Sequence, residues 1–486
     1  MEAAGLVMLV LVAALLTTGL PAWVVLIGVS LSAATVGVAT GGLDGGLLVA
    51  LAPRLVGLLE NDLLQALPLY VLMGALLNRL PLAGILFRAG TAATGGHRSG
   101  PLVAAMGLGA LLAPMNGSVA ASVATLSRVV LPRLRAHGVP AGKGLAVVCV
   151  ASTLGVVVPP SLVLILLGDA MMRAHTEAAN TVGRVAGQMV RVINTQDVFR
   201  GALAPAALFL LLCLILSWWS GRRQPAPETV ETQTLAAEPP LGIAGWVTAV
   251  ATLLFVGGLL AAVAAGYIYA VEAAAMGAVT LLVFGLASRS LDRDAMEAVL
   301  HDTMAVTGAL FALFVGATSF TLVFRGFGTD RLLDGLVAAL PGGAAGATLG
   351  VMAMIAACAF VLDAFEIIFV VIPVLMPPLL VRVPDAVWVS VLVLLTLQVS
   401  FLIPPLGYAV MMVRSAAGAG DMMRGLIRAL APYLAAQAVV LGITLAVPSF
   451  VHVMEPPDDP NATPALSDED AKDQLRSMIP VPPEND

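Results

Sequence analysis

Two stretches decide the fold of this chain: residues 151–166, ASTLGVVVPPSLVLIL, and residues 397–410, LQVSFLIPPLGYAV. Each is an apolar segment of helix length that is interrupted by two adjacent prolines, at 159–160 and at 404–405. Two prolines remove two backbone donors and disfavour helix at the preceding residue, so each segment is predicted to unwind at its pair. For a single pair, a kink or a loop boundary is the competing interpretation. Because the same pattern occurs twice in this chain, unwinding is favoured over a kink or a loop boundary.

Each of these segments follows an apolar stretch that is too long for one helix. The first stretch, 101–132, is interrupted by MNGS, and the second, 344–382, is interrupted by LDAFE. The flanks of the first stretch, 79–100 and 128–143, contain basic residues and no acid, so both flanks are expected in the cytoplasm. The sequence therefore predicts a re-entrant hairpin with its polar tip buried in protein. Two short spans with an opposite-side loop at Asn116 are the alternative.

The hairpins and the broken segments form an internal repeat. Gly117 at the first tip precedes Pro159 by 42 residues, and Asp363 at the second tip precedes Pro404 by 41. With entry from opposite sides of the membrane, the near-equal spacing predicts an inverted-topology repeat, which is the usual architecture of secondary transporters.

The composition agrees with a membrane domain. Of the 486 residues, 59% are hydrophobic and 11% charged, whereas about a quarter of the residues in a soluble domain are charged. Roughly 20 apolar residues are needed for each spanning helix. We therefore expect an all-α polytopic membrane protein with about ten full spans plus the two hairpins. The expected spans are 3–19, 21–40, 64–78, 144–168, 202–219, 243–266, 271–288, 303–324, 386–413 and 431–449.

The remaining segments organise the chain. A first membrane half at 1–219 is predicted to join a second half at 243–450 through a cytoplasmic linker at 220–242, which is rich in Pro, Glu and Gln. The acidic tail at 451–486 is predicted to be disordered. An insertion at 169–201 is predicted to form an amphipathic surface helix.

Several classes of function are excluded by what the sequence lacks. A net charge of −6 without a basic stripe argues against a nucleic-acid partner. The three cysteines lie in apolar runs, so no disulfide framework is expected. There is no HExxH, CxxC, nucleophile elbow or Walker loop, so we predict neither an enzyme nor an ATP-driven pump. The alternative to an ion-driven transporter is an ion channel or a membrane scaffold without coupled transport.

The breaks supply the chemistry of a cation site. Unwound carbonyl oxygens and nearby polar side chains can replace the hydration shell of a small cation, and helix N-termini can face an anionic substrate. Asp363 and Glu366 are the ionisable residues at membrane depth, and each could coordinate a cation or serve a structural role. Neutral side-chain oxygens beside the breaks could also coordinate a cation, or they could hydrogen-bond to their own helices. The residues that carry these oxygens are Ser118, Ser122, Ser152, Thr153, Gln398 and Ser400. Glu272, at the mouth of a span, is expected to be a helix-start acid favoured by the helix dipole.

These residues resemble a known family, the large membrane subunit of tripartite ATP-independent periplasmic (TRAP) transporters, over about residues 3–450. The resemblance rests on NGSVAASVATLSRVVLP (116–132), STLGVVVPPS (152–161), VEAAA (271–275), FVLDAFEIIFVVIP (360–373) and QVSFLIPPLGYAVMMVRS (398–415). It implies an elevator-type importer in the bacterial inner membrane that is driven by sodium and has no other cofactor. It also implies two partners, a small four-helix membrane subunit and a periplasmic substrate-binding protein, and the signatures resemble the branch associated with 2-oxo acids and related organic acids.

The resemblance also assigns site residues. Carried over to this chain, one sodium site comprises Asn116, Ser118, Ser152, Thr153 and Gly155, and the other comprises Asp363, Gln398 and Ser400. The organic acid is expected beside the tips and breaks, at Ser118, Pro159, Pro160, Ser161, Glu366, Pro404, Pro405 and Tyr408.

Overall fold

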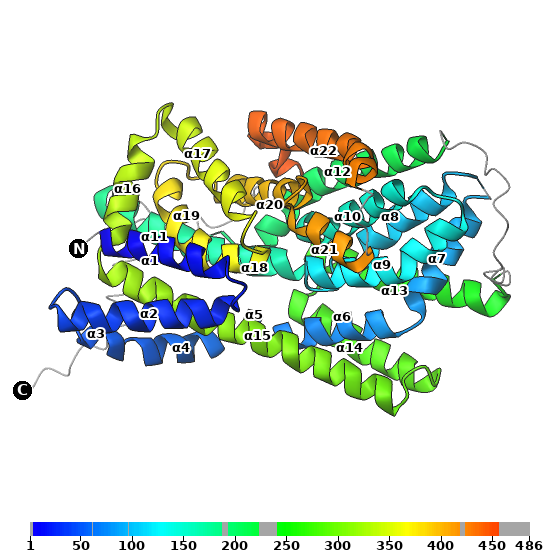
Figure 1. The fold of residues 1–486 in the computed structure, drawn as a ribbon, viewed down its shortest axis with the longest axis horizontal. Coiled ribbons are helices and arrows are strands. Elements are labelled where there is room, and N and C mark those ends of the chain that lie inside the picture. The colour runs from blue at the N-terminus through cyan, green and yellow to red at the C-terminus, as the bar shows by residue number, and fades with distance from the viewer. Residues whose placement is uncertain are drawn as a thin grey trace, which may run out of the picture.

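The protein is an all-helical bundle, described by a computed structural model over residues 3–60, 62–95, 97–186, 193–222, 241–417 and 423–455. Within these ranges there is no strand. Most of the long helices run along the long axis of the molecule (Figure 1). The fold class predicted from composition and hydropathy is therefore confirmed at the level of an all-α architecture.

The first half contains twelve described helices. They are α1 (Ala3–Leu16), α2 (Ala22–Ala39), α3 (Gly46–Val49), α4 (Leu51–Leu59), α5 (Asp62–Gln65), α6 (Leu67–Arg79), α7 (Leu82–Ala93), α8 (Gly100–Leu112), α9 (Val119–Ala136), α10 (Ala141–Val157), α11 (Leu162–Ala186) and α12 (Thr195–Arg222).

The second half contains ten described α-helices with three short helical turns. They are α13 (Ile243–Ala265), α14 (Ala270–Ala287), α15 (Arg293–Gly326), α16 (Thr329–Ala339), α17 (Gly343–Cys358), α18 (Ala364–Glu366), the π-helix η1 (Ile367–Val371), α19 (Ile372–Leu380), α20 (Ala386–Leu402), α21 (Tyr408–Ala417), α22 (Met423–Ala446), and the 3₁₀ turns η2 (Pro448–Phe450) and η3 (His452–Met454).

The helices differ in how much apolar surface they bury. The two helices that lead into the Pro-Pro breaks, α10 and α20, are buried along nearly their whole length. By contrast, α13 leaves large apolar side chains such as Val247 and Leu254 exposed. Exposed apolar side chains all along a helix fit a bilayer as the surrounding solvent.

The number of spans differs from the predicted ten. Within the described residues, seven helices are long and apolar enough to cross a membrane, or up to nine if each bent pair is one span. The stretch 386–413 is two helices rather than one, and α1 has 14 residues. The expected loop after Arg79 is largely helix, because α6 bends by 62° into α7.

Both hairpins have the predicted helix–tip–helix form, with α8 and α9 as arms of the first. Its two ends lie at the same end of the molecule, because both meet the end of α12. At the entry, Ser99 packs so closely on Gly221 that a Cβ there would collide with its backbone. At the exit, Lys143 donates a hydrogen bond of 3.0 Å to the Ser220 carbonyl. In the second hairpin, α17 and α19 both pack on α16.

The prediction of a separate surface helix at 169–201 is wrong over its described part. Residues 169–186 continue α11, and α12 begins at Thr195. Asp169, Ala174 and Ala178 are buried, and the helix packs on α19. The amphipathic pattern was real, but its small-residue face is covered by a segment 200 residues away in the chain.

Two sequence predictions concern segments outside the described residues. Most of the linker at 220–242 and nearly all of the tail at 451–486 fall there, and so do residues 187–192 of the insertion. The division into two halves stays a prediction.

Candidate functional site

The first break separates α10 from α11 at residues 158–161, as the prolines predicted. Pro159, Pro160 and Ser161 are all buried there. The Ser161 hydroxyl oxygen accepts a hydrogen bond of 3.2 Å from the Leu164 N–H, so it caps the first turn of α11. One backbone N–H at the start of α11 is therefore satisfied by a side chain where the helix resumes.

The first hairpin tip is pressed directly against this region. Gly117 adopts a left-handed backbone with φ of 75°, and Ser118 caps α9 by accepting a 3.1 Å bond from the Ala121 N–H. Gly155 of α10 faces the Ala113 carbonyl so closely that a Cβ would collide with it. Gly155 therefore allows α10 to pack closely on the backbone at the end of α8.

Asn116 is the residue at this tip whose chemistry fits a cation. It is 7% exposed, and its Oδ1 has no hydrogen-bond partner among the described residues. Its Nδ2 donates to the Ser122 hydroxyl at 3.3 Å. A buried amide oxygen without a donor carries a desolvation cost of about 1–3 kcal/mol, which a small cation would offset.

The two hydroxyls expected beside Asn116 bond back to their own helix. Ser152 donates to the Cys149 carbonyl at 2.8 Å, and Thr153 donates to the Val150 carbonyl at 2.9 Å. Each oxygen keeps free lone pairs, so their assignment as sodium ligands stays a prediction.

The second break separates α20 from α21 at residues 403–407, so the predicted unwinding is confirmed here too. The Gly407 N–H donates to the Ile403 carbonyl at 2.7 Å and closes the turn around the two prolines. Pro405 and Leu406 are exposed, unlike the prolines of the first break. The Pro-Pro bond is cis at both breaks, 159–160 and 404–405.

Asp363 and Glu366 at the second tip cap each other's backbone. The Asp363 carboxylate accepts from the Glu366 N–H at 2.9 Å, and the Glu366 carboxylate accepts from the Asp363 N–H at 3.0 Å. This is a reciprocal capping box at the start of α18. Tyr408, at the start of α21, packs its ring against Phe401 with ring centroids 5.9 Å apart. The structural role of the pair is thus present, and ion coordination stays a prediction.

The oxygen of Gln398 is already engaged. Gln437 of α22 donates to it at 2.9 Å, while the Gln398 amide nitrogen lacks a partner among the described residues. The Gln398 oxygen keeps a second lone pair, so its assignment as a sodium ligand stays a prediction. Ser400 donates to the Thr396 carbonyl at 2.8 Å. Gln437 was missed from sequence because a single Gln in an apolar helix gives no spacing signal.

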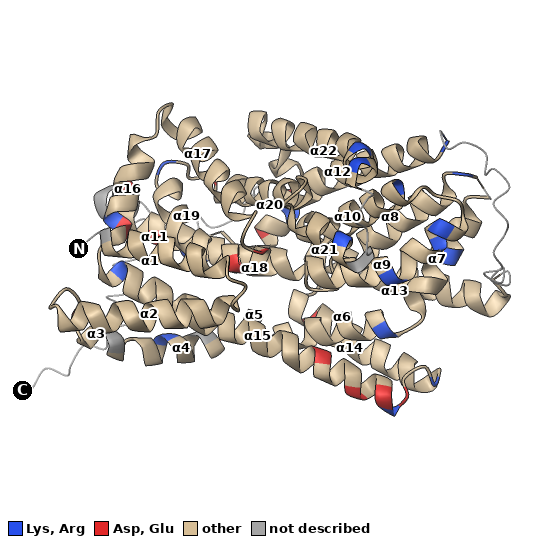
Figure 2. Cartoon of the chain, in the orientation of Figure 1, with Lys and Arg blue, Asp and Glu red and all other residues tan. Residues whose placement is uncertain are grey.

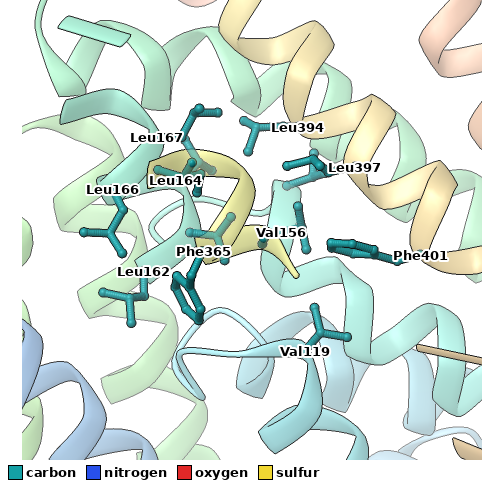
Figure 3. Close-up of a cluster of buried hydrophobic side chains, with 14 of the residues drawn as sticks. Val119, Val156, Leu162, Leu164, Leu166, Leu167, Phe365, Leu394, Leu397 and Phe401 are labelled. Atoms are coloured by element: carbon teal, nitrogen blue, oxygen red, sulfur yellow. The ribbon is translucent and has the colours of Figure 1, made fainter. Parts of the chain in front are cut away.

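Phe365 joins the two hairpins and the two breaks. Figure 3 shows Phe365 in one buried apolar cluster with Val119 of the first hairpin, Val156 and Leu162 on either side of the first break, and Phe401 before the second break. Phe365 is 6% exposed. Four segments that are far apart in sequence therefore meet around one apolar cluster.

Glu272 is a helix-start acid, as predicted. Its carboxylate accepts from the Tyr269 N–H at 2.8 Å and forms a capping box at the start of α14.

In Figure 2 the basic residues gather mainly at one end of the molecule, around α7, and acidic residues mark the start of α15.

Paired broken helices and paired hairpins around a common centre define a class of protein, the polytopic membrane transporters whose sites lie where helices unwind. Residues 9–450 match the family model described as the tripartite ATP-independent periplasmic transporter, DctM component. The chain belongs to this family, and its predicted family resemblance is confirmed.

Individual relatives agree with this membership. The chain is 24% identical over 406 residues to the C4-dicarboxylate TRAP transporter large permease protein DctM of Pseudomonas aeruginosa, covering 82% of this chain and 88% of the relative. It is 23% identical over 414 residues to the sialic acid TRAP transporter permease protein SiaT of Haemophilus influenzae, covering 83% of this chain and 61% of that protein. These relatives are transporter permeases and not enzymes.

A solved structure shares the fold. The YdaH transporter of Alcanivorax borkumensis, described as having an unusual topology, superposes with a TM-score of 0.55 at 18% identity. The match covers 83% of this chain and 89% of that one.

Proposed function

We propose that this chain is the large membrane subunit of a sodium-driven importer of a small organic acid in the bacterial inner membrane. A periplasmic binding protein delivers the acid, and a small four-helix membrane subunit completes the complex. The observation that carries the proposal is the meeting of two hairpin tips and two broken helices at Phe365, in a chain of this family.

The substrate class follows from the relatives. Three of them are named for C4-dicarboxylate, sialic acid and isethionate transport, and all of these compounds are organic acids. An acid of this kind suits a centre in which helices restart at Ser118 and Ser161, because helix N-termini attract anions. The substrate residues proposed from sequence, Ser118, Pro159, Pro160, Ser161, Glu366, Pro404, Pro405 and Tyr408, all border these tips and breaks.

Sodium is proposed as the coupling ion, carried as cargo. The unpartnered Asn116 oxygen supports a cation beside the first break, and the two carboxylates of the second tip support one beside the second. The moving part in the proposed elevator consists of the hairpins and the broken helices.

The test is uptake of radiolabelled succinate into proteoliposomes containing this chain, its small partner and a binding protein. We expect accumulation with an inward sodium gradient and its loss when potassium replaces sodium or when an ionophore collapses the gradient. Vesicles without the binding protein are the matched control. Equilibration that is independent of the gradient would instead support a channel, and no flux in any condition with a panel of organic acids would support a scaffold.

A further inference from the structure

A second polar region lies away from the tips and breaks, in a cavity of about 230 Å³. Its walls come from α11, from α15 and from the second hairpin beyond its tip, and α4 contributes Arg54 at the rim. The volume is below the range of about 300–1,000 Å³ that is usual for drug-sized ligands, so any occupant is small.

The α11 wall carries a fixed guanidinium. Asp169, Arg173 and Glu177 follow one another at intervals of four residues, so they share one face of the helix. Asp169 is buried and accepts a 3.0 Å bond from Arg173 Nε. That contact leaves the terminal nitrogens of Arg173 free to donate toward the cavity, since about half of this side chain is exposed.

The α15 wall neutralises the other carboxylate. Arg325 binds both oxygens of Glu177, at 2.7 and 2.8 Å, and also donates to the Pro373 carbonyl at 3.1 Å. Glu177 is therefore matched by a bidentate partner, as Asp169 is matched by Arg173. The cavity lining also includes Phe314 of α15 and Phe369 of η1, whose ring centroids lie 4.0 Å apart.

The lining therefore has a positive charge in excess. Three arginines face two carboxylates, and both carboxylates are already paired. Arg54 is exposed and has no ion pair with any residue in the described ranges. A guanidinium fork matches the geometry of a carboxylate, and a partly desolvated cavity strengthens that contact.

We propose that this cavity is a carboxylate-binding site, in which Arg54 and the free donors of Arg173 hold a small mono- or dicarboxylic acid between α11, α15 and the second hairpin. The site is separate from the hairpin tips. That the bound acid is the transported one rests on the proposed function, whereas the existence of the anion site does not.

The experiment measures equilibrium binding, not transport. Succinate is titrated calorimetrically into the purified chain in lipid nanodiscs, and the neutral succinamide serves as the comparison ligand. We expect succinate to bind, succinamide not to bind, and Arg54→Gln to weaken succinate binding at least tenfold. Arg331→Gln is the matched control, because Arg331 is an exposed arginine on α16 that does not line the cavity, and it should bind as the unmodified chain does.

A second variant separates the fork from the charge. Arg173→Lys keeps a positive charge beside Asp169 but loses the planar fork, so it should weaken succinate at least threefold while the protein stays folded. Equal affinity of Arg54→Gln and the unmodified chain, equal affinity for succinamide, or absent binding would overturn the site. Binding with these effects in a chain that accumulates no acid in proteoliposomes would leave the site standing and refute the proposed function.

Discussion

The two helix breaks share a sequence pattern but lie in different surroundings. At the first, Pro159 and Pro160 are buried, and the adjoining tip presents the neutral Asn116. At the second, Pro405 is exposed, and the adjoining tip carries two carboxylates. The two copies of the repeat thus share the same backbone pattern, a hairpin followed by a broken helix. They differ in the burial of the prolines and in the charge of the adjoining tip. The first tip packs backbone against backbone on α10 at Gly155, whereas the second tip is held by two carboxylates that cap each other's backbone.

The largest expected effect tests this difference in packing. A Cβ at Gly109 in the first hairpin would collide with the backbone of Ala151, which cannot move freely. Gly109→Ala should lower the free energy of unfolding by about 2–3 kcal/mol, the usual cost of overpacking a core. The measurement is chemical unfolding of the purified chain in detergent.

The matched control lies in the second hairpin. A Cβ at Gly350 would meet only the Leu340 side chain, at 2.8 Å, and that side chain can rotate away. Gly350→Ala should cost less than about 1 kcal/mol, because Ala also gains helix propensity. Equal losses in the two hairpins would contradict the proposed contrast in packing.

The next effect concerns the charge that only the second tip carries. Asp363→Asn keeps the helix cap, since Asn caps as well as Asp, but removes the charge. If the carboxylate binds sodium, the sodium concentration for half-maximal uptake should rise about tenfold, equivalent to about 1.4 kcal/mol. Asn116→Ala at the neutral tip should raise it about threefold. Uptake curves are compared at equal amounts of folded complex, and an unshifted curve for Asp363→Asn would refute the ligand assignment.

A third prediction separates structure from ion binding at Gln398. Because Gln437 donates to the Gln398 oxygen, Gln437→Leu strands a buried polar group and should cost about 1–3 kcal/mol of stability. The sodium dependence of the remaining uptake should stay unchanged. The opposite outcome, a shifted sodium curve with normal stability, would support Gln398 as a sodium ligand.

The smallest effect concerns how the two buried inner helices begin. Pro140 precedes α10 without a side-chain cap, whereas Asp385 caps α20 and also binds His452 at 2.9 Å. Partial burial lowers the pKa of His452, but its hydrogen bonds to Asp385 and Glu455 outweigh this, so the pKa lies above its usual value.

This stabilisation has a defined pH window. A raised folded-state pKa means that the contribution is complete below the unfolded value of about 6.5 and is lost as pH rises through the folded pKa. Since His452 is about one-third exposed, the contribution should stay below about 1 kcal/mol. We expect the stability difference between the unmodified chain and His452→Gln to shrink between pH 6 and pH 9. A difference that is constant with pH would argue against the ion pair.

Local sequence was sufficient to predict the helix breaks and the hairpin tips, because these depend on residue type and on the pattern of apolar residues. The breaks at 158–161 and 403–407 followed from two Pro-Pro pairs that each come after a polar interruption of an apolar stretch. A Pro-Pro pair alone is not enough, because Pro377 and Pro378 lie inside α19. The polar interruptions of apolar stretches likewise predicted the tips at Gly117 and Asp363.

Local sequence was insufficient wherever a partner came from a distant segment. The face of α11 predicted at the membrane surface is covered by α19. The pairing of Arg325 with Glu177 joins residues 148 positions apart, so no spacing could indicate it.

By itself, the sequence determined that this protein is a helical membrane protein, where its helices break and which tips carry charge, because backbone donors and hydropathy are properties of each residue. Only the tertiary structure decided which break is buried, which amide oxygen is left without a donor and which arginine faces a cavity, because burial and pairing depend on packing between segments that are distant in the chain.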